Sequence, residues 1–156
     1  MEFMTGVKKP DTLELQELYE ESMVGKTVRV NGAVHTIRDM GEVAFVILRK
    51  RDGLLQCVYE EETAGFDLKD LKEAATVEAE GILEKEERAP GGIEVRLTGI
   101  KILSLPDEPM QLPVAKWKLN TSLEAKLDYR SLSLRNLRER AVFRIQEGLV
   151  RGFRDY

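Results

Sequence analysis

Alternation between apolar and polar residues is the feature that most constrains the fold of this chain. From Thr27 onward, valines at positions 28, 30 and 34 alternate with Arg29, Asn31 and His35. A period of two residues is typical of a β-strand that buries one face and exposes the other. Gly32 interrupts the middle of this strand and predicts a sharp bend or a bulge at that point.

Four further segments have the same alternation or the apolar composition of a strand, namely residues 43–49, 54–59, 76–86 and 93–103. The residues KRDG at 50–53 predict a hairpin turn between the first two segments, and APGG at 89–92 predicts a turn between the last two. Residues 66–75 lie between the two pairs. They predict a short helix with Leu68 and Leu71 facing inward.

Three strands, a helix and two strands follow one another in the order of an OB-fold barrel. We therefore predict an all-β fold, a five-stranded OB-fold barrel with a helix between strands 3 and 4, followed by a C-terminal helical segment. Alternate apolar side chains fill the interior of so small a barrel, which leaves the outer face available to a ligand. An SH3-like barrel has similar periods and is the alternative.

Helical patterns flank the predicted barrel. Asp11 or Thr12 is the expected cap of a short helix that ends near Gly25. Prolines at 106, 109 and 113 predict an extended connector. Residues 136–156 predict a long amphipathic helix, and its apolar face needs a partner on this chain, on a second copy or on a further domain. The predicted organisation is a barrel domain at 1–104, a hinge at 105–130 and the start of another domain at 131–156.

Charge is unevenly distributed along the chain. The net charge of −4 argues weakly against a nucleic-acid partner. Residues 26–56, however, contain six basic and three acidic residues, whereas residues 57–88 contain four basic and eleven acidic residues. Such segregation allows a locally positive surface that attracts phosphates.

Several kinds of protein are excluded by composition. The single cysteine, Cys57, excludes an internal disulfide and a multi-cysteine metal site, and we expect it to be a core residue. The longest apolar run, residues 43–48, is too short to span a bilayer, and the N-terminus does not resemble a signal peptide. We therefore expect a cytoplasmic protein with no membrane association and no bound metal.

No phosphate-binding loop, paired metal ligands or nucleophile motif is present, so we expect no catalytic residue in this chain. Phe45 and Gln56 are more informative, because they lie on adjacent predicted strands with side chains on one face. An exposed ring stacks on an unpaired base, worth roughly 1–3 kcal/mol, and an amide hydrogen-bonds the base edge. The alternatives are a core role for Phe45 and, for His35, an ordinary strand position instead of a contact to a base or phosphate.

Four segments resemble aspartyl-tRNA synthetases. VRVNGAVHTIRDMGEVAFVILRKRDGLLQCVY (28–59) is similar to the first three barrel strands of that family, and GGIEVRLTGIKILS (91–104) to the last strand. LDYRSLSLRN (127–136) resembles the segment that opens the class II catalytic domain, and AVFRIQEGLVRGFRDY (141–156) resembles the helix that leads into motif 1. The sequence of this C-terminal segment is more similar to archaeal and eukaryotic-type members of the family than to the common bacterial type.

The resemblance implies that the barrel binds the anticodon stem-loop of a tRNA. In the family, the aromatic residue matching Phe45 stacks on an anticodon base, and the residues matching Gln56 and Glu94 read the central uridine. The arginine matching Arg38 contacts the stem-loop. With Arg29 and His35 from the polar positions of the first strand, these residues form the predicted RNA-binding set.

The resemblance also implies a parent enzyme that aspartylates tRNA with ATP and Mg²⁺, possesses class II motifs 2 and 3, and is a homodimer. Because those two motifs are missing here, we expect this chain alone to be inactive. The sequence departs from the family at Ala33, where the family has tryptophan, and at Ser131 and Ser133. Glu84 and Glu86 stand where bacterial-type members have arginines.

Four alternatives remain open at this point. The domain could belong to an asparaginyl or a lysyl enzyme, or to an aspartyl enzyme that also charges asparagine tRNA. It could also be a freestanding OB-fold RNA-binding protein that dimerises through its C-terminal helix. The fourth alternative is a structural barrel with no RNA ligand.

Overall fold

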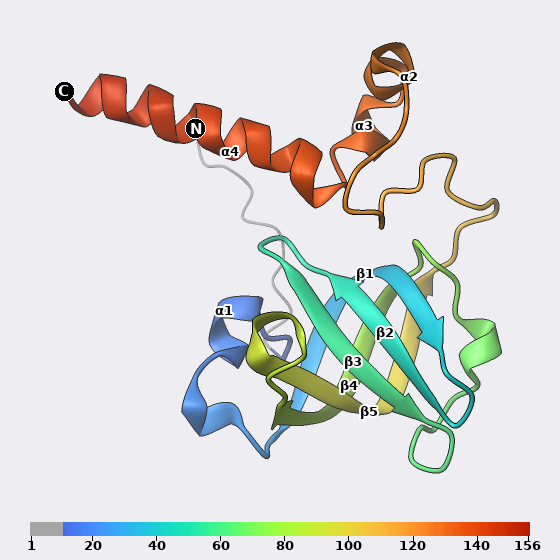
Figure 1. Cartoon of the computed structure of the whole chain (residues 1–156). Helices are drawn as coiled ribbons and strands as arrows, with labels where there is room; N and C mark the ends of the chain where they lie inside the picture. The colour runs from blue at the N-terminus through green and yellow to red at the C-terminus, as the bar shows by residue number, and fades with distance from the viewer. Residues whose placement is uncertain (1–10) are drawn as a thin grey trace. The chain divides into compact units, whose positions relative to one another are not determined.

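The computed structural model describes residues 11–156, which divide into two compact units (Figure 1). The first unit ends at Pro109, and the second spans Met110–Tyr156. Each unit has its own cluster of buried apolar residues. The division falls inside the predicted hinge at 105–130.

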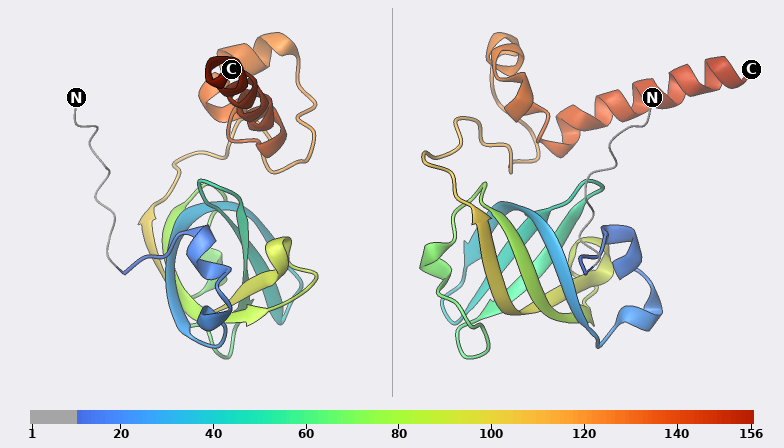
Figure 2. Two further views of the ribbon diagram at one scale, coloured as in Figure 1. Left: turned by 90° about the vertical axis from the view of Figure 1, so that its left-hand side faces the viewer. Right: turned by 180° about the vertical axis from the view of Figure 1, so that it is seen from behind.

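Five strands form the first unit: β1 (Thr27–Asp39), β2 (Val43–Arg49), β3 (Leu54–Glu60), β4 (Thr76–Lys85) and β5 (Ile93–Ser104). They close into a barrel in the order β1-β2-β3-β5-β4 (Figures 1 and 2). The β3–β5 pair is parallel and the other four pairs are antiparallel. This arrangement confirms the five predicted strands, and their ends differ from the predicted ones by a residue or so.

The core of the barrel consists of every second residue along each strand. In β2 these residues are Ala44, Val46 and Leu48, and in β3 they include Leu55 and Cys57. Cys57 is a free cysteine, and burial raises the pKa of its thiol to about 12. The predicted core role of Cys57 is therefore confirmed, and its thiol is protonated at neutral pH.

Strand β1 pairs with both of its neighbours in turn. Its first half pairs with β4 and its second half with β2, and Ala33 pairs with both. Gly32 stands beside this change of partner, where a Cβ atom would lie 3.2 Å from the Cβ of Leu48. The β-bulge occurs three residues later, between Val34 and Thr36, and His35 is the extra residue. The irregularity predicted at Gly32 is thus a close strand approach, followed by a bulge.

The predicted helix at 66–75 is wrong, because this segment contains only the 3-10 turn η2 (Leu68–Asp70). Tertiary contacts hold the backbone on both sides of the turn. The Tyr59 hydroxyl donates to the carbonyl of Phe66 at 3.2 Å, and the N–H of Ala74 donates to the carbonyl of Val34 at 2.8 Å. Tertiary packing thus overrides a weak local preference for helix.

The N-terminal helix is shorter than predicted and is capped by a different residue. It consists of α1 (Leu15–Leu18) and the 3-10 turn η1 (Glu21–Met23). Glu14 is the cap, because its side chain and that of Glu17 form a capping box. The predicted end near Gly25 is confirmed: Gly25 has a φ of 80°, and its N–H donates to the carbonyl of Leu83 at 2.7 Å.

Lys50 fixes this N-terminal segment to the barrel. Its ammonium group donates to the carbonyl of Leu13 at 2.8 Å and to that of Asn31 at 3.0 Å. The side chain is almost fully buried. Lys50 therefore does not contribute to the positive outer surface that the charge distribution predicts for residues 26–56.

The turn between β4 and β5 is confirmed as the short 3-10 segment η3 (Pro90–Gly92). Gly91 has a φ of 81°, a conformation that residues with a side chain rarely adopt. A Cβ atom at this position would also collide with the ring of Tyr19. The turn therefore requires glycine for two independent reasons.

The second unit contains the helices α2 (Leu123–Asp128), α3 (Arg130–Ser133) and α4 (Leu137–Asp155). The long helix predicted at 136–156 is confirmed. A small apolar cluster of Leu112, Val114 and Leu119 lies in the preceding connector. The predicted boundary between hinge and next domain, at residues 130 and 131, falls within α3.

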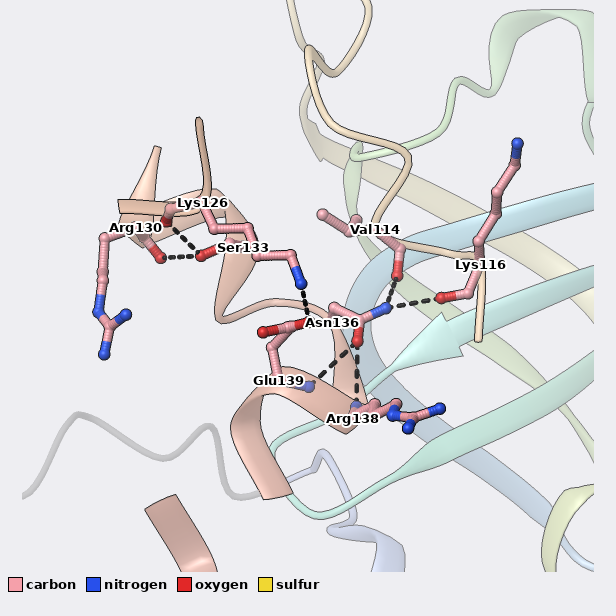
Figure 3. Close-up of polar contacts among 8 residues, drawn as sticks. All are labelled: Val114, Lys116, Lys126, Arg130, Ser133, Asn136, Arg138 and Glu139. Carbon is pink, nitrogen blue, oxygen red and sulfur yellow. Dashed lines mark hydrogen bonds and ion pairs between the residues drawn. The ribbon is translucent and has the colours of Figure 1, made fainter. Parts of the chain in front are cut away.

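Asn136 joins the connector to the beginning of α4 (Figure 3). Its side-chain oxygen accepts from the N–H groups of Arg138 and Glu139 at 3.1 and 3.2 Å, which caps the helix. Its amide nitrogen donates to the carbonyls of Val114 and Lys116 at 2.9 and 2.6 Å. The buried side chain of Asn136 thus pairs with two N–H groups at the start of α4 and with two carbonyls of the connector.

Beyond this junction, α4 is apolar on a broad face and largely exposed. The exposed apolar side chains are Val142, Phe143, Ile145, Leu149, Val150 and Phe153. Among residues 11–156, no helix combines the length and the apolar character needed to cross a bilayer.

Candidate nucleic-acid interface

Side chains that point away from the core form two neighbouring rows across the barrel. The first outer row consists of the register partners Arg38, Phe45, Val58 and Arg96. The second outer row consists of the register partners Thr36, Ile47, Gln56, Glu94 and Glu84. The alternation along β2 and β3 confirms that Phe45 and Gln56 share a face, as diagonal neighbours.

Phe45 and Gln56 are both partly exposed, in contrast to the apolar residues beside them. Ile47 and Val58 also point outward, yet they are only 4% and 7% exposed. Neighbouring atoms therefore cover these two side chains, and the accessible surface beside the amide includes the Phe45 ring. A flat base stacked on that ring would meet a polar group at its edge.

Gln56 and Glu94 are joined by a hydrogen bond. The amide nitrogen of Gln56 donates to a carboxylate oxygen of Glu94 at 2.9 Å. Because a carboxylate only accepts, the amide nitrogen must face Glu94, which leaves the amide oxygen of Gln56 to face elsewhere. The parallel β3–β5 pairing creates this contact by making the two residues register partners.

Arg96 lies next to this pair and was not in the predicted RNA-binding set. Its guanidinium is 3.3 Å from Glu84 and 3.7 Å from Glu60, measured between nitrogen and carboxylate oxygen. Its position two residues after Glu94 on β5 is the sequence signal that could have identified it, because residues two apart on a strand share a face.

Arg38 is the register partner of Phe45 and is exposed. A guanidinium next to an outward aromatic ring suits a phosphate flanking a stacked base, since arginine can donate two parallel hydrogen bonds to phosphate. The structure therefore brings together four of the six predicted residues: Arg38, Phe45, Gln56 and Glu94.

Arg29 lies on the part of β1 that pairs with β4 and does not join this group. Its guanidinium donates two hydrogen bonds to one oxygen of Glu80, at 2.9 and 3.2 Å, and lies 3.8 Å from Asp11. The hydrogen bond and the negative charge of Glu80 raise the pKa of Arg29. A phosphate at this position would have to compete with Glu80.

His35 is in the β1 bulge and is only 7% exposed, so its ring is not on the open face. Burial lowers the pKa of His35, and the positive charge of Arg49 lowers it further, whereas Glu73 opposes the shift. Its buried Nδ1 atom has no hydrogen-bond partner among the described residues. A neutral, buried ring is not suited to stack on a base, so the structure favours the alternative of an ordinary strand position for His35.

The charge around the outer rows is mixed. On β4 the outward residues include the acids Glu78, Glu80 and Glu84, which repel a phosphate backbone from that side of the barrel. Within residues 11–156, no three side chains of the histidine, cysteine, aspartate or glutamate type come together as a metal site.

Comparison with known proteins gives consistent results. Residues 28–103 match the tRNA anti-codon family, described as an OB-fold nucleic acid binding domain. Over 132 residues the chain is 37% identical to an aspartate–tRNA(Asp/Asn) ligase of Deinococcus radiodurans, which covers 83% of this chain and 28% of the ligase. The corresponding ligase of Archaeoglobus fulgidus is 33% identical over 138 residues, or 86% of this chain and 32% of the ligase.

Among solved structures, the asparaginyl-tRNA synthetase of Pyrococcus horikoshii in complex with asparaginyl-adenylate is similar, with a TM-score of 0.75 and 28% identity. The similarity covers 94% of this chain and 34% of that protein. The chain thus spans about a third of the length of these relatives. The family match supports the OB-fold over the SH3-like alternative, and the first unit is an OB-fold anticodon-binding domain of the kind found in the N-terminal region of archaeal-type aspartyl-tRNA(Asp/Asn) synthetases.

Proposed function

We propose that the two outer rows bind the anticodon loop of a tRNA whose central base is uridine. The Gln56–Glu94 hydrogen bond beside the outward ring of Phe45 is the observation that carries this proposal. It combines a stacking surface with a pair of polar groups of fixed orientation, which is what recognition of an unpaired base requires.

Stacking on Phe45 supplies affinity with little dependence on the base. The ring contributes roughly 1–3 kcal/mol per stacked base, because every base has a flat π-face. Loss of the ring should therefore weaken every stem-loop that this face binds.

Discrimination comes from Gln56 and Glu94. Uracil presents one donor, N3–H, between two carbonyl acceptors, whereas cytosine presents an acceptor at N3 and an amino group at C4. The amide oxygen of Gln56 or the carboxylate of Glu94 can accept from uracil N3–H, and the amide N–H of Gln56 can donate to a uracil carbonyl. The N3 acceptor of cytosine would face an acceptor, so the mismatch is repulsive.

Arg38 contacts the phosphate backbone in this proposal, and it positions the loop without reading a base. Since Lys50 is buried and Arg29 is paired with Glu80, few cations remain near the outer rows. The dependence of binding on salt should therefore be shallow for a nucleic-acid-binding domain.

The whole protein is proposed to be an aspartate–tRNA ligase, as the names of the curated relatives indicate for those proteins. It would activate aspartate with ATP and Mg²⁺ and transfer it to the terminal adenosine of tRNA, as a cytoplasmic homodimer. Residues 105–130 would be its hinge and 131–156 the start of its catalytic domain. No cluster of three acidic, histidine or cysteine side chains is found among residues 11–156, and no step is assigned to these residues. Charging of asparagine tRNA is part of the same proposal, because those relatives are named for both tRNAs.

The test is titration of the full chain with anticodon stem-loops of aspartate, asparagine, lysine and an unrelated tRNA. We expect the three loops with a central uridine to bind more tightly than the unrelated loop. Phe45→Ala and Gln56→Ala should each weaken the binding of uridine loops by about 1–3 kcal/mol. Equal affinity for all four loops would contradict the proposal.

Two control variants make this test specific. Gln146→Ala removes an exposed amide from α4 and should leave all four affinities unchanged. Phe45→Tyr keeps a ring and should retain most of the binding that Phe45→Ala loses. If Phe45→Ala and Gln56→Ala bind like the unchanged chain while remaining folded, the roles given to these residues are wrong.

A further inference from the structure

We propose that Arg96 is a positioning residue for base discrimination, because it holds the carboxylate of Glu84 away from Glu94 and so leaves Glu94 to Gln56. This inference rests on the proposed function for its biological meaning. Its structural content, the control of one hydrogen bond by a neighbouring cation, can be tested without RNA.

The register creates a conflict that needs an opposite charge. Glu84 on β4 and Glu94 on β5 are direct partners in an antiparallel pair. Side chains at such positions have Cβ atoms roughly 4.5–5.5 Å apart, and like charges there repel each other. Without a positive charge nearby, the two carboxylates would compete for the same hydrogen-bond donors.

Arg96 provides the compensation from the next outward position on β5. Its two terminal nitrogens lie near Glu84, at 3.3 Å, and near Glu60, at 3.7 Å. Glu94 is not one of its carboxylate partners among the contacts found, and instead accepts the Gln56 amide at 2.9 Å. Arg96 thus lies near the acids of β3 and β4, Glu60 and Glu84, whereas Gln56 donates to Glu94 on β5.

The position of the guanidinium favours an indirect role over contact with RNA. Its Nε atom is buried, and its terminal nitrogens lie near carboxylates on both sides. The side chain is 43% exposed, and a phosphate would have to compete with Glu60 and Glu84 for its terminal nitrogens. Arg38 is exposed at the other end of the same outer row.

The consequence is a defined prediction for specificity. If Arg96 is lost, Glu84 is no longer held and the charge near Glu94 becomes more negative, so the Gln56 amide has two carboxylates to choose between. The amide would then lose its single orientation. Affinity for a uridine loop should fall more than affinity for the same loop with cytidine.

The experiment compares four forms of the full chain: unchanged, Arg96→Ala, Arg96→Ala with Glu84→Gln, and Lys101→Ala as a matched control. Lys101→Ala removes a cation from an exposed position farther along β5. Each form is titrated with one stem-loop in which only the central base differs, uridine or cytidine. Circular dichroism establishes that each form is folded, and Arg96→Gln, which also removes the charge, replaces Arg96→Ala if that variant is not.

We expect Arg96→Ala to reduce the ratio of cytidine Kd to uridine Kd by about tenfold. Adding Glu84→Gln should restore most of the ratio, because it removes the charge that Arg96 offsets. Lys101→Ala should leave the ratio unchanged. A merely structural role for Arg96 would not be rescued by a neutral residue at position 84.

The side-chain amide signals of Gln56 in a nitrogen–proton correlation spectrum provide a measurement without RNA. They should shift and exchange faster with solvent in Arg96→Ala, and return in the double variant. An unchanged Gln56 amide in Arg96→Ala overturns the inference. So does equal weakening of both loops without rescue, which would indicate a direct phosphate contact. If the amide responds as expected but the unchanged chain does not prefer uridine, the positioning role stands and the proposed function fails.

Discussion

The barrel and the helix α4 use their apolar residues in opposite ways. In the barrel, alternate residues of five strands meet in one cluster, and core residues such as Leu97 are fully buried. In α4, residues such as Leu149 and Phe153 are 60% and 84% exposed. The barrel therefore contains the partners of its own apolar residues, whereas the second unit orders α4 through its N-terminal end, at Asn136.

This difference separates the two sources of order in the chain. In the barrel, the pairing register of the strands sets the position of every outward side chain. An isolated helix is held by its capping and its intrinsic preferences, and these are weak without packing. The change in stability caused by a substitution should therefore differ in sign and size between the two regions. Hydrogen exchange of barrel and helix amides measures the two changes separately.

Truncation of a leucine should show the largest contrast. Leu97→Ala leaves a cavity in the barrel and should lower its free energy of unfolding by about 2–5 kcal/mol. Leu149→Ala removes an exposed side chain and should change the stability of α4 by less than about 0.5 kcal/mol. Hydrogen exchange of the slowest amides in each region measures both effects. A loss above about 1 kcal/mol for Leu149→Ala, twice what a surface substitution ordinarily costs, would show that α4 is packed.

Alanine in place of glycine should have opposite effects in the two regions. A Cβ atom at Gly81 would lie 2.2 Å from the carbonyl oxygen of Arg96, so Gly81→Ala must push β4 and β5 apart. We expect a loss of about 1–3 kcal/mol in the barrel. Gly148 has nothing within 4 Å, and Gly148→Ala should stabilise α4 by about 1 kcal/mol. Thermal unfolding followed at 222 nm checks the second effect, and equal signs would contradict the comparison.

Removal of Asn136 should weaken the helix end without affecting the barrel. Asn136→Ala loses a cap and two contacts to the connector, which should cost about 1–2 kcal/mol locally. Amides in the first turn of α4 should exchange faster, while those of β2 and β3 stay unchanged. Asn120→Ala, an exposed position in the connector, is the control. Asn136→Asp keeps the capping oxygen but not the donor, so full recovery in that variant would assign the whole effect to the cap.

The smallest expected effect is a pH dependence confined to the barrel. Burial lowers the pKa of His35, and Arg49 lowers it further. The unfolded chain therefore binds the proton more readily than the folded barrel, and stability falls as pH drops through the ordinary value of about 6.5 toward the folded pKa. His35→Gln should flatten this part of the profile. Urea unfolding at pH 7.5 and 5.5 measures the difference between the two proteins, and parallel profiles would exclude His35 as the source.

The strands were predictable because a period of two is a local property of sequence. The shared face of Phe45 and Gln56 followed from that period and the hairpin between their strands. The hydrogen bond between Gln56 and Glu94 did not, since it depends on the parallel pairing of β3 with β5, two strands 38 residues apart at this contact. The Arg96 contacts have the same origin.

Errors in the prediction occurred where distant contacts decide local structure. Residues 66–75 were predicted to be helical from two leucines, but contacts from Tyr59 and Val34 hold the backbone on both sides of a single 3-10 turn. Lys50 was counted as a surface cation, although its ammonium group is surrounded by carbonyls of Leu13 and Asn31. Charge and period alone do not report such partners.

The alternation within each strand also has an evolutionary consequence. In β3, Leu55 and Cys57 maintain the barrel while the intervening Gln56 faces outward, so a mutation of Gln56 need not disturb the core. Selection can then act on the outer face and on folding through different positions of one strand. Such independence allows the outer face of the barrel to change by single substitutions while the core stays intact.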